Sequence, residues 1–445
     1  MKYPGLFCFL FACLSAVAQQ QAAPTAQPPP GVAPVLTLHE ALTTALKNSL
    51  DLQISQNNVD VQGLRNSAGF AGALPTVGLQ ASSNEVLNNT KQEFNTGQTV
   101  TRTGAAASQY NAGLAGNFLL FNGGRVVAAR RRLDELSQIS QLQLNSTVQN
   151  VLADVSLRYY AVVQQVRYIR TLQASVDVSR QKLRLIETRQ SVGLANNADR
   201  FQAQLDLNAQ LQTQQQQLLA ADQARANLLR ALTLDVNTPV AVEDTIPVNN
   251  SLRWNELEAA LDKNPDLLAA DRQVRVLELL EREARAARFP SVGLNAGTNF
   301  ARSANAVGLT LFNQSFGPYA GLGLSVPLYS GGVNKRLVDI ARLNIRTTEL
   351  QSQALHRTYR LNAHNAWLAY ERQLGLVQNA EENYRVARQL LHLVQLRLEA
   401  GLSTLVDVRV AQQSFEDAGY RLVNYRYAAK SSEITLRQLG ALLVP

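Results

Sequence analysis

The segment Leu74-Pro75-Thr76-Val77-Gly78-Leu79 returns in the second half of the chain as Phe289-Pro290-Ser291-Val292-Gly293-Leu294. Further on, Phe121-Asn122-Gly123-Gly124 returns as Tyr329-Ser330-Gly331-Gly332. Both motifs recur after roughly 210 positions and in the same order, which indicates a duplicated structural unit. We therefore predict two structural repeats, over residues 36–240 and 241–445.

Each repeat contains two segments in which apolar and polar residues alternate, which is the period of a β-strand. They predict strands at about 75–83 and 110–121 in the first repeat, and at about 290–300 and 318–329 in the second. The connecting stretches, Asn84–Ser108 and Ala301–Gly317, are rich in small and polar residues and predict long loops. We expect the glycine pairs Gly123-Gly124 and Gly331-Gly332 to turn each returning strand into a helix.

Two very long helices are predicted after these glycine pairs. Residues 125–192 contain neither Gly nor Pro, and residues 333–400 contain only Gly375. At ~1.5 Å per residue, each segment predicts a helix of roughly 100 Å, a length that a coiled coil or a repeat has to support. A heptad seam is predicted in the second helix, because apolar residues recur there every seven positions: Tyr370, Val377, Tyr384, Leu391 and Leu398.

Gly-Leu pairs mark the ends of both long helices. Gly193-Leu194 is followed by Asp199, and Gly401-Leu402 is followed by Asp407. Glycine ends a helix because it tolerates positive φ, so helices at 198–234 and 404–439 are predicted to return from these tips. A carboxylate near a helix start either caps free N–H groups or, in a ring of copies, lines a channel mouth. Shorter helices are predicted ahead of the strands, among them 50–73 and 266–288.

The N-terminus reads as a secretory signal over residues 1–18. Lys2 precedes an apolar run, and Ala16-Val17-Ala18 matches a small-residue cleavage site. Residues 19–35 are rich in Pro and Gln and predict a disordered tail. Both cysteines, Cys8 and Cys13, lie in the signal, so no disulfide is expected after cleavage, and lipidation at Cys13 stays open.

Composition favours long helices over a compact enzyme core, because aromatic residues make up only 6% of the chain. The net charge is +8, but the basic residues do not cluster with aromatic ones, so no nucleic-acid partner is expected. We interpret Arg130-Arg131-Arg132 as a surface or membrane-headgroup contact. Aromatic residues near the predicted strand ends favour a girdle at a lipid interface. They are Tyr110, Phe118, Phe121, Phe300, Phe312, Phe316, Tyr319 and Tyr329.

We expect no catalytic, cofactor-binding or metal site in this chain. The histidines do not cluster with metal-ligand spacing, and His356 and His364 are two helical turns apart. No nucleophile elbow, phosphate-binding loop or pair of catalytic carboxylates is evident. The chain is therefore not expected to be an enzyme.

The order and spacing of these motifs resemble those of TolC-type outer-membrane factors, the outer membrane efflux protein family. These proteins are exit ducts of Gram-negative efflux and type I secretion systems. The resemblance covers about residues 36–440 and implies a mainly α fold with a small membrane β part. It implies a homotrimer in which a twelve-stranded β-barrel in outer-membrane lipid continues into a twelve-helix periplasmic α-barrel.

The resemblance also implies a periplasmic entrance at the two tips, formed by Gly193, Leu194, Asp199, Gly401, Leu402 and Asp407. A periplasmic adaptor protein and an inner-membrane pump are the implied partners. This chain departs from some relatives at Val410, where they carry a second acid, and at Ser403, where they carry a basic residue. An acidic ring and an arginine-based gate lock are therefore in doubt.

A soluble periplasmic coiled-coil adaptor or scaffold is the alternative. The strands bounded by proline and glycine pairs, in matching positions of both repeats, speak against it. The sequence does not identify the cargo, which could be a drug, a metal ion, a siderophore or a protein. The class of pump and the gating residues are also left open.

Overall fold

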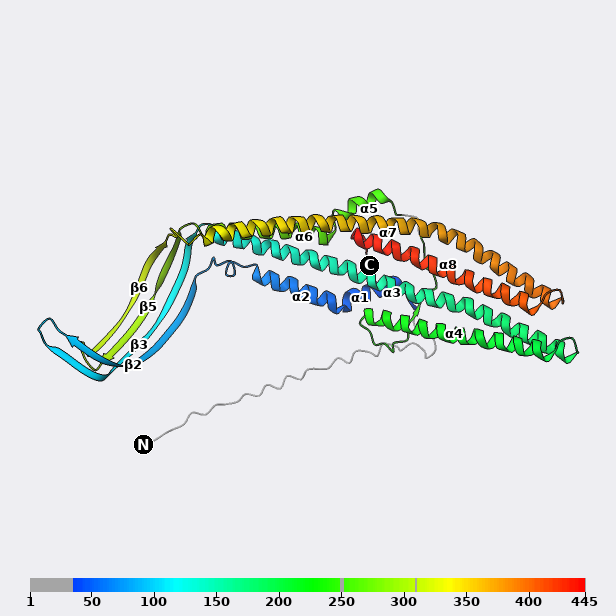
Figure 1. Cartoon of the computed structure of the whole chain (residues 1–445), viewed down its shortest axis with the longest axis horizontal. Helices are drawn as coiled ribbons and strands as arrows, with labels where there is room; N and C mark the ends of the chain where they lie inside the picture. The colour runs from blue at the N-terminus through cyan, green and yellow to red at the C-terminus, as the bar shows by residue number, and fades with distance from the viewer. Residues whose placement is uncertain (1–34, 249–251, 309, 445) are drawn as a thin grey trace, which may run out of the picture.

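The computed structural model describes residues 35–248, 252–308 and 310–444. The predicted signal 1–18 and almost all of the predicted tail 19–35 lie outside this part. The molecule is elongated, with a curved sheet at one end and long helices that run from it to the other end (Figure 1).

The curved sheet has four antiparallel strands in the order β2-β3-β5-β6. Their bounds are Thr76–Glu93 (β2), Thr99–Asn122 (β3), Ser291–Asn305 (β5) and Phe312–Ser325 (β6). Repeat one supplies β2 and β3, repeat two supplies β5 and β6, and the β3–β5 pair joins them. The duplication therefore produces one continuous sheet, with β2 and β6 at its edges.

The prediction of two long loops between the strands is wrong. Within Asn84–Ser108 the strands continue to pair, from Glu85 opposite Ser108 as far as Glu93 opposite Thr99. In the second repeat, β5 and β6 occupy most of 301–317. Ser, Asn, Thr and Ala dominate both faces here, so no apolar alternation reveals the strand, while backbone hydrogen bonds hold the ladder. The predicted strand 318–329 also ends early, at Ser325, shortly before Pro327.

The long helices α3 (Arg125–Ser191) and α7 (Val333–Glu399) leave the sheet, and the returning helices α4 (Asn197–Ala231) and α8 (Leu405–Leu439) pack beside the parts of them that lie far from the sheet. Gly124 and Gly332 precede α3 and α7 with φ of +83° and +78°. Side chains other than glycine rarely adopt this left-handed region, so the glycine pairs set the direction in which each helix departs. The mainly α fold class is confirmed.

Four shorter helices pack along the long ones: α1 (Leu38–Asn48), α2 (Leu50–Arg65), α5 (Trp254–Leu261) and α6 (Pro265–Ala286). Helix α2 ends at Arg65 rather than at the predicted residue 73, and turns containing Gly69 and Gly72 follow it. A two-stranded parallel sheet between β1 (Val35–Leu36) and β4 (Ala241–Val242) was not predicted. The Tyr159 hydroxyl fixes it, donating to the Leu36 carbonyl (3.0 Å) and accepting from the Glu243 N–H (3.1 Å).

The main core lies midway along the helices, where α1, α3, α4 and α8 meet. Tyr159, Leu152 and Leu228 are almost fully buried there. The heptad seam of α7 is buried at Tyr370, Val377, Leu391 and Leu398. Among the described residues, none of the helices is both long and apolar enough to span a membrane.

Candidate functional site

The two faces of the curved sheet differ sharply in chemistry. Strand register places Val77 beside Gly116 and Ala296, Leu79 beside Leu114 and Thr298, and Phe118 beside Leu294 and Leu322. Neighbouring residues on paired strands point to the same side, so these form one largely apolar face. Much of it is exposed, as at Leu79 (75%) and Leu322 (72%).

The opposite face is polar and rich in glycine. The same register collects Gln80, Asn111, Asn117, Asn295 and Asn299 on this side. Gly297 lies among them, and a Cβ there would meet the Leu114 carbonyl oxygen at 2.0 Å, so only glycine allows β3 and β5 to approach this closely. No element of the described chain covers the polar face, and β2 and β6 each leave one edge unpaired.

The first helical tip is held by backbone hydrogen bonds and a capping box. Gly193 (φ +81°) follows α3, and the Leu194 N–H reaches back to the Arg189 carbonyl at 2.7 Å. The Asn196 side chain accepts from the Asp199 N–H (2.9 Å), while the Asp199 carboxylate accepts from the Asn196 N–H (3.3 Å). Asp199 is therefore the third residue of α4 and completes the cap.

The second tip repeats this geometry with a different cap. Gly401 has φ +77°, and the Leu402 N–H reaches the Arg397 carbonyl at 2.8 Å. The Asp407 carboxylate accepts from the Thr404 N–H (2.8 Å) and from the Ser403 hydroxyl (3.1 Å). Hydrogen bonds from the Thr404 backbone, then from the Thr404 and Ser403 hydroxyls, hold the pKa of Asp407 below its ordinary value.

Arg189 connects the two tips. Its guanidinium donates from the last turn of α3 to the Leu398 carbonyl (2.5 Å) and the Glu399 carbonyl (3.3 Å) at the end of α7. A cation at a helix C-terminus satisfies free carbonyls and complements the helix dipole. Sequence reasoning missed this contact, because Arg189 looks like any basic residue in a last helical turn.

Behind the tips, a buried ion pair ties α3 to α4 and reaches toward α8. The Lys182 ammonium lies 2.5 Å from the Asp206 carboxylate, and their side chains are 1% and 12% exposed. Arg409 of α8 lies 3.7 Å from the same carboxylate. The helix contacts therefore couple the two hairpins through charge as well as through the apolar seam.

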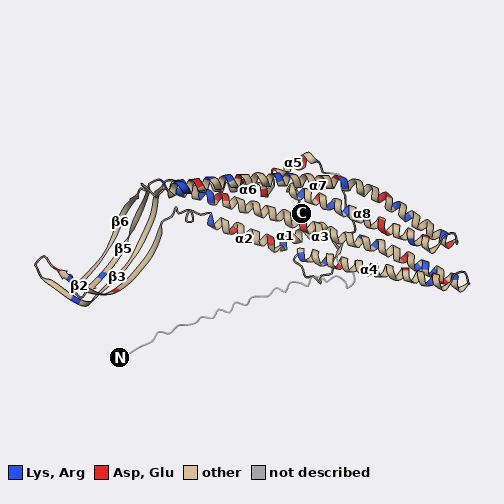
Figure 2. Cartoon of the chain, viewed as in Figure 1, with Lys and Arg blue, Asp and Glu red and all other residues tan. Residues whose placement is uncertain are grey.

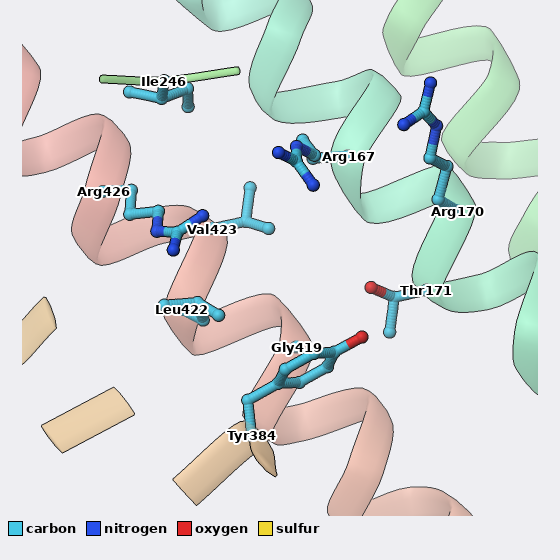
Figure 3. Close-up of a pocket in the computed structure, with 9 residues that line it drawn as sticks. All are labelled: Arg167, Arg170, Thr171, Ile246, Tyr384, Gly419, Leu422, Val423 and Arg426. Atoms are coloured by element: carbon cyan, nitrogen blue, oxygen red, sulfur yellow. The ribbon is translucent and has the colours of Figure 1, made fainter. Parts of the chain in front are cut away.

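Halfway along the helices, a small cavity of about 130 Å³ lies between α3 and α8. Figure 3 shows Arg167 and Arg426 extending into it from opposite helices, with Tyr384 and Thr171 below. Arg167 and Arg170 pair with Asp244, and Arg426 pairs with Glu381 at 2.6 Å. Burial and the facing Arg426 guanidinium lower the pKa of Arg167. Gly419 lines the cavity, and a Cβ at this position would lie 2.6 Å from the Thr171 methyl carbon.

No group of three or more His, Cys, Asp or Glu side chains within the described residues could hold a metal ion. The structure instead brings the predicted site residues into two tip clusters and two strand-to-helix turns. Each tip holds its Gly, Leu and Asp together, and Arg189 joins the two clusters.

Comparison with known proteins places this arrangement in a family. The family model for outer membrane efflux proteins matches residues 41–233 and 257–441. The chain belongs to the outer membrane efflux protein family. The two matched segments correspond to the two repeats and leave out the connection between them.

Relatives and solved structures of this family match over most of the chain. The pyoverdine export outer membrane protein OpmQ of Pseudomonas aeruginosa is 28% identical over 90% of this chain and 84% of its own length. The outer membrane protein TolC of Vibrio cholerae is 25% identical over 67% of this chain and 70% of its length. The Campylobacter jejuni CmeC outer membrane channel superposes with a TM-score of 0.75 at 17% identity, covering 91% of this chain and 86% of that one.

As a member of the outer membrane efflux protein family, the protein is an outer-membrane channel and an efflux exit duct. The family consists of transport conduits rather than enzymes. The alternative of a soluble coiled-coil adaptor or scaffold is not favoured. An apolar sheet face suits lipid and a polar opposite face suits a water-filled lumen, which is the pattern of a membrane-embedded channel wall.

Proposed function

We propose that three copies of this chain assemble into a homotrimer that closes a twelve-stranded barrel. The observation that carries the proposal is the four-stranded sheet with two unpaired edges. A bilayer does not tolerate unpaired strand edges, so the edges β2 and β6 need partners. Two copies would give eight strands, whose interior side chains fill the barrel, whereas three copies leave room for a lumen.

Within this proposal, the polar sheet face lines the lumen and the helices continue the duct into the periplasm. The tips at Gly193, Leu194 and Asp199 and at Gly401, Leu402 and Asp407 form its periplasmic entrance, where a periplasmic adaptor protein and an inner-membrane pump engage. Exposed apolar side chains at the ends of the hairpins support this, since Leu194 is 77% and Leu402 is 69% exposed. Residues 1–18 act as the export signal and residues 19–35 as a tail.

The similarity to known proteins does not identify the cargo of this channel. Relatives are named for pyoverdine export, solvent efflux and toluene efflux. The inner-membrane pump, rather than this duct, is expected to select what is carried.

Cysteine crosslinking tests the trimer. The natural cysteines, Cys8 and Cys13, lie in the predicted signal, so introduced cysteines react alone. Ala81→Cys on β2 is combined in turn with Ala320→Cys, Leu322→Cys or Leu324→Cys on β6. Oxidation in membranes should give a covalent trimer as the largest product at one of these registers, and each single variant should stay uncrosslinked. A ladder that stops at the dimer would contradict the proposal.

A second crosslinking experiment tests the tips as the adaptor site. Leu194→Cys and Leu402→Cys carry a photoreactive crosslinker in cells that express the adaptor. Leu343→Cys, 68% exposed near the sheet end of α7, is the matched control. The tip variants should capture the adaptor and the control should not. Equal capture at all three positions would overturn the entrance assignment while leaving the trimer intact.

A further inference from the structure

A band of positive charge surrounds the place where the helices leave the sheet. In the described part of the chain, the following exposed side chains here take part in no ion pair or side-chain hydrogen bond, and we call them the junction collar. They are Arg125, Arg130, Arg131, Arg282, Arg288, Lys335 and Arg336. Of the described acids nearby, Glu283 pairs with Arg132, Glu281 with Arg285 and Arg342, and Asp339 with Arg342, while Asp134 is hydrogen-bonded only to the Asn66 and Gln138 amides. The collar cations outnumber this one acid without an ion pair, so the collar carries net positive charge.

The three chain segments of the collar lie together. Arg132 of α3 contacts Glu283 of α6 at 2.6 Å, and the Asn334 amide of α7 donates to the Ala287 carbonyl after α6 at 3.4 Å. Figure 2 shows Lys and Arg gathered at this junction. The charges form one patch although they come from both repeats.

The positive charge at the starts of α3 and α7 is also contrary to the usual preference for acidic residues in the first turn of a helix. Helices α1, α2, α4, α5, α6 and α8 each carry an acid in the first turn. Helices α3 and α7 carry none there; α3 begins with Arg125, and the first four residues of α7 include Lys335 and Arg336. Cations near a helix N-terminus are repelled by its dipole, so this arrangement is unfavourable for the chain alone. An external anion would remove the conflict.

Exposed apolar side chains next to the collar indicate where the membrane surface lies. Leu328 is 93% exposed, Tyr329 89%, Phe70 69% and Phe289 56%. Aromatic side chains beside Lys and Arg are typical of a membrane–water interface. The shortest strand of the four-stranded sheet, β6, has 14 residues. At ~3.3 Å per residue and a tilt of about 40°, it reaches about 35 Å along the membrane normal, more than the apolar band of about 25 Å.

We propose that the junction collar is a binding site for the phosphate groups of anionic phospholipids in the leaflet next to the helices. The apolar side chains at Phe70, Phe289 and Tyr329 lie at the level of the acyl chains and headgroups, and the unpaired cations meet the phosphates beyond them. The inference rests on the family's outer-membrane location and on the collar itself. It does not depend on which adaptor or pump the tips engage.

Native mass spectrometry of the detergent-purified protein tests the site with phosphatidylglycerol and, for comparison, zwitterionic phosphatidylcholine. The test variant is Arg130→Gln/Arg131→Gln/Lys335→Gln/Arg336→Gln. The matched control, Arg184→Gln/Arg372→Gln/Arg388→Gln/Arg421→Gln, removes four exposed, unpaired cations from the helices away from the sheet. Folding of each variant is checked by the helical circular dichroism and the oligomer mass.

The wild type and the control should retain phosphatidylglycerol in preference to phosphatidylcholine. The collar variant should bind phosphatidylglycerol at least about tenfold more weakly, because each cation near a lipid surface adds to the attraction. Unchanged phosphatidylglycerol binding in the collar variant would overturn the proposal. An equal loss in the control would also overturn it, because net charge rather than the collar would then explain the binding. Both variants should conduct like the wild type in planar bilayers, so a failed channel would be recognised separately.

Discussion

Gly419→Ala in α8 should destabilise the protein, although alanine is normally the better helix former. A Cβ at Gly419 would lie 2.6 Å from the Thr171 methyl carbon of α3 and 3.3 Å from the Tyr384 ring of α7. Replacing a helical glycine by alanine gains about 0.5–1 kcal/mol. Overpacking a tight core site costs about 1–3 kcal/mol, so the expected net loss is about 1–2 kcal/mol.

Gly375→Ala is the matched control for this prediction. Gly375 lies in α7, is exposed, and would place its Cβ in open space, so only the helix-propensity gain of about 0.5–1 kcal/mol should appear. Thr171→Ala removes the clashing methyl group and should suppress the Gly419→Ala defect in a double-mutant cycle.

Urea unfolding followed by circular dichroism ranks the variants. The expected order of stability is Gly375→Ala above wild type and wild type above Gly419→Ala. A Gly419→Ala protein as stable as Gly375→Ala would refute the close packing of α3, α7 and α8. A defect that Thr171→Ala leaves untouched would refute the assignment of the clash to Thr171.

Three further results are expected. Asp206→Asn should lower the free energy of unfolding in urea by about 3–5 kcal/mol, because it leaves the buried Lys182 ammonium without its carboxylate. The double variant Lys182→Met/Asp206→Leu should recover most of that loss. A double variant less stable than Asp206→Asn would contradict this. The hydrogen-exchange protection factor at the second tip, which removes the intrinsic pH dependence of exchange, should be level above the ordinary aspartate pKa of about 3.9. It should fall as the pH drops through the lowered pKa of Asp407, since the folded state then loses an ionised cap. Asp407→Asn should abolish this acid step, whereas Thr404→Val should only reduce it because the Thr404 N–H still donates to the carboxylate; an unchanged step in Asp407→Asn would argue against the cap. Gly297→Ala should eliminate the oligomer seen in unheated gel electrophoresis, because its Cβ would meet the Leu114 carbonyl, whereas Gly317→Ala faces open space and should assemble normally.

Local sequence signals predicted the starts of β2 and β5 and the long helices well, but placed the starts of β3 and β6 too late, at 110 and 318 rather than at Thr99 and Phe312. Pro75 and Pro290 precede strands, and the glycine pairs adopt the left-handed φ that a strand-to-helix turn needs. The sequence predicts a loop over the outer halves of β2 and β3, because the residues beyond Asn84 are polar on both faces. Such a strand is stabilised by its neighbour's backbone, which no single-segment pattern reveals.

The tip residues were found by repetition, but their partners were not. Gly193, Leu194 and Asp199 recur as Gly401, Leu402 and Asp407, and each set folds into its own cap. Arg189, Lys182 and Arg409 carry no such local signature. Their roles arise because residues far apart in the chain meet across helices, as Arg189 does with Leu398.

By itself, the sequence determined the duplication, the helix lengths and the turns, because periodicity and glycine or proline placement act over a few neighbouring residues. The tertiary structure decided how the repeats join, through the β3–β5 pairing that makes one sheet with an apolar and a polar face. It also decided that two unremarkable helix starts and one helix end gather into the junction collar. Pairing and charge clustering between distant segments depend on which elements become neighbours, and only the folded chain specifies that.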